Sequence, residues 1–202
     1  MNRLILAAIA ATLSACGGGG GSGGGGNAQL PAQQQQLGAY LGTWVADCDR
    51  HQQDSATITR LSDDSVRIAN RTDYYAAANC SGAVVATQTQ TADVTATYTG
   101  AVDASVVLAP PGSATTIRID RVTASVGQYA LAVTGTGVTR TQANGKPQWC
   151  INYGDGSATC IVDEGVQPGS SATGGLYARD NQLYELSPSG STWVVNQRYT
   201  KR

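Results

Sequence analysis

The chain has 202 residues, a formal net charge of −1 and only 13% charged residues. Sparse and balanced charge excludes the basic surface on which nucleic-acid-binding proteins depend. Phe is absent, nine Tyr and three Trp supply the large rings, and Thr and Val are abundant, which together favour β-structure. We therefore expect no nucleic-acid partner and one β-rich domain over residues 38–202, long enough to bury its own core.

Residues 1–15 have the organisation of a short export signal. Arg3 precedes the apolar run 4–11, and small residues stand directly before Cys16. The run is too short to cross a bilayer as a helix, which takes about 20 apolar residues. We predict that this segment is a signal peptide.

The end of that segment, Leu13-Ser14-Ala15-Cys16, resembles the lipobox of bacterial lipoproteins. The resemblance implies that Cys16 is lipidated and becomes the new N-terminus. Its three acyl chains (palmitate, for example) would then anchor the chain far more firmly than one chain does. Gly17 is not the Asp that retains such lipoproteins in the inner membrane, so the resemblance favours the outer membrane, with the domain facing the periplasm or the cell surface. The alternative is an ordinary signal peptide that is cleaved without lipidation.

Residues 16–37 comprise the lipidated cysteine and a predicted tether. Residues 17–26 contain nine glycines and one serine, and a Gln-rich stretch continues to Gln36. Such a composition buries no core and gives a flexible chain. Random-coil scaling over roughly 20 residues gives a reach of about 25 Å, which clears the lipid headgroups.

Four segments alternate between apolar and polar residues with period two, as half-buried strands do. These segments are 57–61, 65–68, 93–98 and 116–120. Turn signals separate them and the segments that follow, and no amphipathic helix is evident after the signal peptide. Many short strands joined by turns predict an all-β, antiparallel up-and-down β-barrel, with a β-sandwich as the alternative.

Five is an odd number of cysteines, so disulfides alone cannot pair them all in an exported protein. Setting Cys16 aside for lipidation leaves an even number. The other four are expected to form two disulfides in an oxidising compartment: Cys48, Cys80, Cys150 and Cys160. The last two are symmetric about Asp155, and a three-residue hairpin loop there places them opposite each other, close enough for a bridge. The first two then pair by elimination. Metal binding is the alternative for these four residues, but they lack C-x₂-C spacing.

The two ends of the domain resemble the calycin superfamily, which comprises the lipocalins and their relatives. Gly42 and Trp44 form a G-x-W motif near the start, and Arg198 lies near the end. The resemblance implies that Trp44 closes one end of the barrel, that Arg198 packs across its ring as a cation–π pair, and that Gly42 permits close packing. The chain departs from lipocalins because no helix follows the last predicted strand.

Candidates for catalysis are few. His51 is the only histidine and is therefore the only candidate for the histidine of a Ser–His–Asp arrangement. Its polar neighbours favour a solvated loop residue instead. Asp163 and Glu164, with Asp155, are candidates for calcium, but their spacing does not match an EF-hand loop, and we interpret them as turn and surface acids. We expect no catalytic residue, no metal and no cofactor.

The aromatic residues are the remaining signal. They either line a ligand cavity, as in many barrels, or form core and hairpin pairs, the interpretation we favour for any one of them: Tyr74, Tyr75, Tyr98, Tyr129, Trp149, Tyr153, Tyr177, Tyr184 and Trp193. The leading hypothesis is a lipoprotein anchored to the outer membrane, whose non-catalytic barrel binds a small apolar ligand or an envelope protein. The alternative is a structural envelope component with a fully packed barrel and no ligand.

Overall fold

The computed structural model describes residues 36–109 and 111–202. The predicted signal peptide, Cys16 and nearly all of the predicted tether lie outside these residues, so they remain predictions. One 3₁₀ turn precedes thirteen strands. Their bounds are η1 Gly38–Tyr40, β1 Gly42–Ala46, β2 Gln52–Arg60, β3 Ser65–Tyr75, β4 Val84–Gln90, β5 Val94–Val106, β6 Thr115–Val126, β7 Leu131–Thr134, β8 Val138–Ala143, β9 Lys146–Asn152, β10 Ala158–Val162, β11 Ser170–Arg179, β12 Gln182–Ser189 and β13 Thr192–Lys201.

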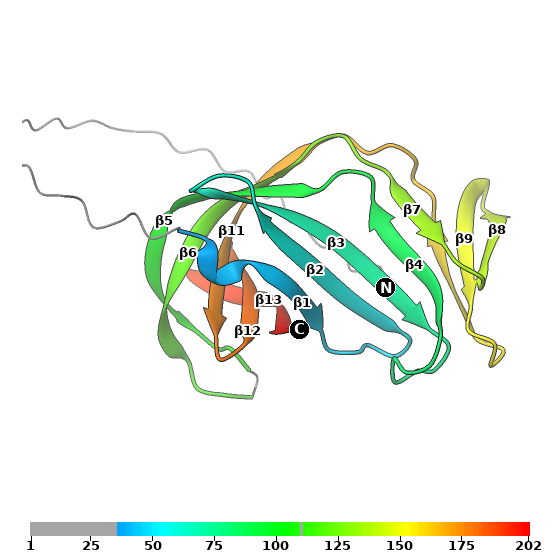
Figure 1. The fold of residues 1–202 in the computed structure, drawn as a ribbon, viewed down its shortest axis with the longest axis horizontal. Coiled ribbons are helices and arrows are strands. Elements are labelled where there is room, and N and C mark those ends of the chain that lie inside the picture. Colours follow the sequence, from blue (N-terminus) through cyan, green and yellow to red (C-terminus); the bar gives the residue numbers. More distant parts are fainter. Residues whose placement is uncertain (1–35, 110) are drawn as a thin grey trace, which may run out of the picture.

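Eight of these strands form a closed antiparallel ring (Figure 1). Around the ring they follow chain order: β1, β2, β3, β5, β6, β11, β12 and β13, and β13 pairs with β1 to close it. This is up-and-down connectivity, so the prediction of an all-β, barrel-like fold is confirmed. In the part of the chain that the structure describes, no helix is long and apolar enough to cross a membrane.

The chain leaves the ring twice, and we term these excursions the annex: β4, β7 and a separate sheet of β8, β9 and β10. Strand β3 is long enough to serve both parts, since residues 65–68 pair with β5 in the ring and residues 71–75 pair with β4. Strand β7 pairs with β4. Figure 1 shows β8 and β9 at the opposite end of the molecule from β5 and β6. The annex buries a core of its own around Trp149 and Ile151.

Alternate side chains of the ring strands point inward and form the barrel core. This core includes Trp44, Ile58, Val66, Leu183 and Tyr199, and η1 adds to it from one side. Burying a large apolar side chain stabilises a fold by about 1.5–3 kcal/mol. Because the chain has no Phe, the barrel core is filled by Trp, Tyr and aliphatic side chains.

A second apolar group, which we term the outer cluster, lies on the outer side of the ring. Ile117 and Ile119 lie on the opposite face of β6 from the inward-facing Val122, in the register that β6 forms with β5. They pack with Leu186 and Trp193 from the β12–β13 hairpin. Gly175 on β11 makes room for this contact. A Cβ at that position would lie 2.4 Å from Ile119 Cγ2 and 2.8 Å from the Trp193 ring.

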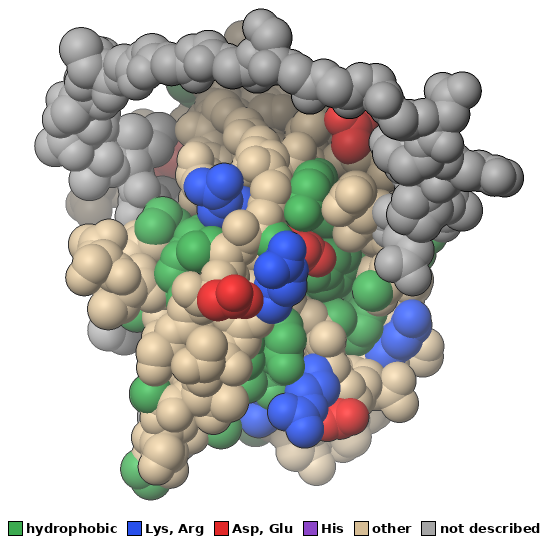
Figure 2. All heavy atoms as spheres, turned by 90° about the vertical axis from the view of Figure 1, so that its left-hand side faces the viewer, with side chains coloured by type: hydrophobic (Ala, Val, Ile, Leu, Met, Phe, Trp, Pro, Cys, Tyr) green, Lys and Arg blue, Asp and Glu red, His purple; other side chains and the backbone are tan. Residues whose placement is uncertain are grey.

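The face of the molecule on the β5–β6 side mixes side chains of different kinds. Figure 2 shows hydrophobic side chains among polar atoms there, with acidic and basic side chains lying side by side. Several of the ion pairs of the molecule join residues of opposite charge on one strand or on neighbouring segments, such as Arg67 with Asp93. On this face the charges are interspersed rather than segregated by sign.

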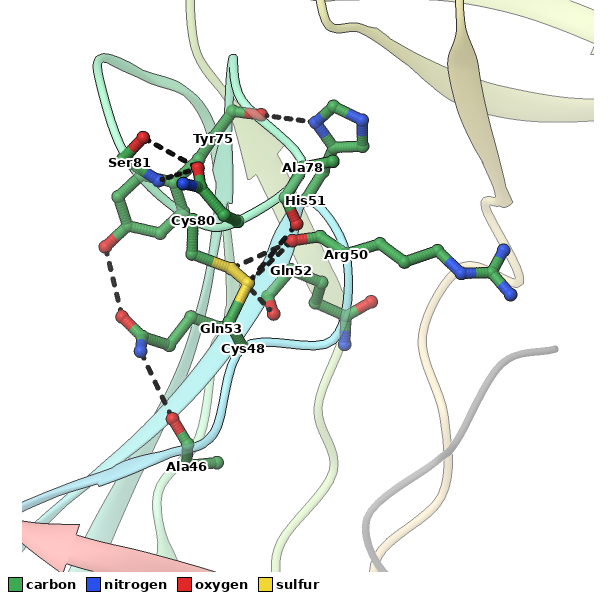
Figure 3. Close-up of a disulfide and its surroundings, with 11 residues drawn as sticks. Ala46, Cys48, Arg50, His51, Gln52, Gln53, Tyr75, Ala78, Cys80 and Ser81 are labelled. Carbon is green, nitrogen blue, oxygen red and sulfur yellow. Dashed lines mark hydrogen bonds between the residues drawn. A yellow bond between two sulfur atoms is a disulfide. The ribbon is translucent and has the colours of Figure 1, made fainter.

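Both predicted disulfides are present in the structure. Cys150 and Cys160 are opposite each other across β9 and β10, with Cα atoms 4.1 Å apart. The Tyr153 N–H donates to the Ser157 carbonyl at 3.2 Å, which closes the three-residue hairpin loop that the symmetry argument requires. The second disulfide, Cys48–Cys80 with Cα atoms 5.8 Å apart, ties the β1–β2 turn to the loop before β4 (Figure 3).

Candidate functional site

Trp44 packs where η1 covers the barrel core. Its side chain is only 2% exposed, and its indole Nε1 donates a hydrogen bond to the Tyr40 carbonyl oxygen at 2.6 Å. The Tyr40 hydroxyl donates to Asp120 Oδ2, also at 2.6 Å. Burial, together with this hydrogen bond, raises the pKa of Tyr40 well above its ordinary value. This end of the interior is thus packed and its polar groups are satisfied.

The cation beside Trp44 is Lys201, not Arg198. Lys201 Nζ lies 5.1 Å from the centroid of the Trp44 ring, and the two residues are opposite each other across β1 and β13. Side chains alternate along a strand, so Arg198 falls on the other face of β13, where it forms an ion pair with Asp47. The predicted cation–π role of Arg198 is therefore wrong. Gly42 does permit close packing, since a Cβ there would lie 3.2 Å from Lys201 Cε.

Away from η1, the inward-facing positions of the ring become polar. Asp54 on β2, Asn70 and Thr72 on β3, and Glu185 on β12 continue the inward-facing sets that begin with buried apolar residues. Asp54 and Thr72 are opposite each other in register. The hydroxyl of Tyr199, from β13, belongs to the same group. We term these five the polar band: Asp54, Asn70, Thr72, Glu185 and the Tyr199 hydroxyl.

Asp54 is oriented by its neighbours in register. Thr72 Oγ1 donates a hydrogen bond to Asp54 Oδ1 at 2.6 Å, and Gln52 Nε2 donates to the same oxygen at 3.4 Å. Among the described residues no donor contacts the other carboxylate oxygen. Asp54 is therefore held in place while one of its oxygens stays open to a further donor.

Glu185 lacks such support. Its carboxylate forms neither a hydrogen bond nor an ion pair with any residue that the structure describes, and the residue is half-buried. Desolvation and the negative charge of Asp54 raise the pKa of Glu185 to about 7, because both disfavour the ionised form. The carboxyl of Glu185 therefore changes its charge near neutral pH.

Tyr199 contributes a buried hydroxyl without a partner among the described residues. Its side chain is 1% exposed, and neither its Oη nor the buried Oδ1 of Asn70 has a hydrogen-bond partner in residues 36–109 and 111–202. Burial raises the pKa of Tyr199 well above its ordinary value, and the charges of Glu185 and Asp54 add to this effect. An unpaired buried polar group costs about 1–3 kcal/mol. The polar band thus holds hydrogen-bonding capacity that the described chain leaves unused.

His51 lies in the turn between β1 and β2, so the prediction of a loop residue is confirmed, but the side chain packs between the barrel and the annex and is not solvated. Its ring stacks on Tyr153 with centroids 3.8 Å apart, and its side chain is 13% exposed. Nδ1 donates to the Tyr75 carbonyl at 2.9 Å (Figure 3), and Nε2 lies 3.8 Å from Asp155 Oδ2. Within the described residues no hydroxyl or thiol is hydrogen-bonded to His51, so the ring joins two parts of the fold rather than a Ser–His–Asp arrangement.

The acidic pair singled out by the sequence is engaged with basic residues of the annex. Arg140 donates to Asp163 at 2.7 Å and lowers the pKa of that carboxyl. Lys146 Nζ lies 3.0 Å from Glu164. Across the described part of the chain, no group of three or more His, Cys, Asp and Glu side chains is placed to hold a metal ion.

Seven of the nine aromatic residues named by the sequence analysis lie in the three cores, whereas Tyr75 and Tyr129 belong to none of them. Tyr98 packs against the barrel core, three others belong to the annex core, and three belong to the outer cluster: Tyr74, Trp149, Tyr153, then Tyr177, Tyr184 and Trp193. For these residues the interpretation as core and hairpin pairs is confirmed. A surface depression beside η1, lined by Leu37, Leu41 and Val66 among others, has about 150 Å³ of space, partly open solvent, and no residue of the polar band lines it.

Comparisons with protein-family models, with curated proteins and with solved structures found no match. The polar band holds both buried side-chain atoms that lack a hydrogen-bond partner among the described residues, Asn70 Oδ1 and Tyr199 Oη, together with the carboxyl of Glu185, whose pKa is raised. Perturbed ionisable groups of this kind are enriched at functional sites. We therefore take it as the candidate functional site.

Proposed function

We propose that the chain is a lipoprotein, anchored to the outer membrane through Cys16, whose β-barrel binds a small molecule inside the ring without catalysis. The observation that carries the proposal is the buried Tyr199 hydroxyl, which has no partner among the described residues and whose pKa is raised by the charges of Glu185 and Asp54 as well as by burial. Ligand sites are concave and present a few converging polar groups. The polar band supplies polar groups of this kind on the inward-facing side of the ring.

The polar band alters the ligand chemistry that the sequence suggested. An apolar ligand needs an apolar space, and the η1 side of the interior is filled by Trp44, Leu183 and the ring of Tyr199. The unused groups lie on the polar side. A ligand seated there must form hydrogen bonds, because an apolar molecule would bury the carboxylates without pairing them.

The anchoring part of the proposal is supported by the lipobox resemblance of residues 13–16 and by the glycine-rich segment that follows. We expect Cys16→Ser to move the protein from the membrane fraction to the soluble fraction of its own cells, with the barrel still folded. Ser22→Ala, in the same segment, is the matched control and should stay with the membranes. A Cys16→Ser protein that remains in the membrane fraction would contradict the anchor.

Native mass spectrometry of the protein extracted from its own cells tests the binding function. A small molecule that co-purifies at one per chain would support the proposal. The alternative, a structural envelope component, is favoured by the tight barrel core around Trp44. A chain that carries no small molecule and co-purifies with a partner protein in a fixed stoichiometry would support this alternative.

A further inference from the structure

We propose that the polar band binds a small organic cation that carries several N–H donors, of the alkylammonium or guanidinium class. This inference rests on the proposed function, since it names the class of molecule that the same interior would hold. It follows from the open hydrogen-bonding positions of the band and from the charge around them.

The open positions of the band are mostly acceptors. Four are acceptors, namely both carboxylate oxygens of Glu185, the free oxygen of Asp54 and the buried Oδ1 of Asn70, and the amide nitrogen of Asn70 is an open donor. The Tyr199 hydroxyl can act in either direction. A ligand that satisfies this set must therefore supply several donors. Donors that carry a positive charge satisfy it best, because charge-assisted hydrogen bonds are roughly twice as strong as neutral ones.

The negative charge of the band is not balanced by the described chain. Neither Asp54 nor Glu185 forms an ion pair with a described Lys or Arg. The two basic side chains near the end of β13 are engaged elsewhere, since Lys201 lies over Trp44 and Arg198 is paired with Asp47 on the outer face. A cationic ligand would supply the missing charge.

Other ligand classes fit the band less well. An anion would be repelled by two carboxylates, and an apolar molecule would leave them unpaired. Calcium takes six to eight oxygen ligands, and magnesium requires near-octahedral geometry. Within the described residues, no group of three or more candidate metal-binding side chains is assembled. An organic cation makes no such demand on geometry.

The charge of the band depends on pH through Glu185. The ionisable groups that face it are Asp54 from β2 and Tyr199 from β13. With a pKa of about 7, Glu185 is ionised in roughly one molecule in ten at pH 6 and nine in ten at pH 8. The affinity for a cation should therefore rise by up to about tenfold between pH 6 and pH 8.

The test uses the purified full chain and two probes of the same length, 1,4-diaminobutane and the neutral 1,4-butanediol. We expect saturable binding of the diamine in calorimetry and ligand-observed NMR at pH 8, and none of the diol. Glu185→Gln should weaken diamine binding by about tenfold or more, and Tyr199→Phe by several-fold while the ring still fills the core. Glu164→Gln, at the only other glutamate, is the matched control and should bind like the parent chain.

The possible outcomes distinguish this inference from the proposed ligand-binding function on which it rests. Failure of the diamine and of methylguanidinium to bind, or binding that Glu185→Gln leaves unchanged, would overturn the inference. Calcium binding that depends on Glu185 would also overturn it, in favour of a metal. If a fluorescent fatty acid binds inside the barrel while the cations do not, the inference fails and a binding function stands. If no probe binds and native mass spectrometry shows only the bare chain, both fail.

Discussion

Replacing Glu185 by Gln should stabilise the protein at pH 8 and leave its stability near pH 4 almost unchanged. Gln has the shape of the protonated carboxyl and carries no charge. The folded-state pKa of about 7 lies above the ordinary value of 4.5, so the folded chain binds this proton more tightly than the unfolded chain. The stability linked to Glu185 is therefore complete below pH 4.5 and is lost as the pH rises through 7.

The size of the effect follows from the interval between the two pKa values. At 1.36 kcal/mol per pH unit, a rise from 4.5 to about 7 corresponds to about 3 kcal/mol as an upper bound. Glu185 keeps part of its surface accessible, and water near a charge screens it. We therefore expect a gain of about 1–2 kcal/mol for Glu185→Gln at pH 8.

Urea unfolding followed by Trp fluorescence, at pH 4, 5.5, 7 and 8, measures this difference. The free energies of unfolding of the two proteins should nearly coincide at pH 4 and separate progressively above pH 5. Glu164→Gln, which removes a surface ion pair with Lys146, should give an offset of at most about 1 kcal/mol that does not grow in this way. A Glu185→Gln protein that is less stable at pH 8, or equally shifted at pH 4 and pH 8, would refute the reasoning.

Two further predictions concern packing and the annex. Gly175→Ala should lower the free energy of unfolding by about 1–3 kcal/mol through overpacking of the outer cluster. Gly174→Ala, whose Cβ would have its nearest neighbour at 3.5 Å, should change it by no more than about 0.5 kcal/mol, and equal effects in denaturant titrations would contradict the packing described. Joint replacement of Cys150 and Cys160 by Ala should cost about 3 kcal/mol on the chain-entropy model. Hydrogen exchange should then accelerate first in β8–β10, whereas uniform acceleration across the ring would argue against a separately closed annex.

The sequence predicted the features that depend on short stretches of chain. Segments 65–68 and 93–98 alternate without interruption; the first lies in β3, and the second lies in β5 from Val94 onward. The pairing of Cys150 with Cys160 follows from the symmetry of one hairpin loop. In each case the determining geometry is contained within about a dozen residues, so local alternation and turn chemistry are sufficient.

The error at Arg198 comes from the calycin resemblance, which assigned a late basic residue to the Trp44 ring without the register of the last strand. In the structure, Tyr199 on β13 belongs to the barrel core. Side chains alternate along a strand, so Lys201 shares the face of Tyr199 and Arg198 does not. Lys201 is opposite Trp44 in register and is therefore the residue that reaches its ring.

Glu185 was missed for a different reason. One face of β12 carries Tyr184 and Leu186, and the other carries Leu183 and Glu185. Hydrophobicity alone assigns the first face to the interior, because it has no charged residue. In the structure that face is covered by the outer cluster, which leaves the face with Glu185 turned into the barrel. The assignment depends on the packing of a hairpin from another part of the chain.

Folding alone gives no account of a carboxyl at this position. Glu185 bonds to no described residue, it lies near a second carboxylate, and its ionisation is disfavoured at neutral pH. Stability and affinity can be measured separately in the same variant, and the two results together are more informative than either. If Glu185→Gln raises stability at pH 8 and also abolishes diamine binding, the carboxylate lowers stability in the free chain because it serves a ligand. If stability rises and binding is unaffected, Glu185 is a buried charge without a role in the site, and the Tyr199 hydroxyl must be explained by enclosed water instead.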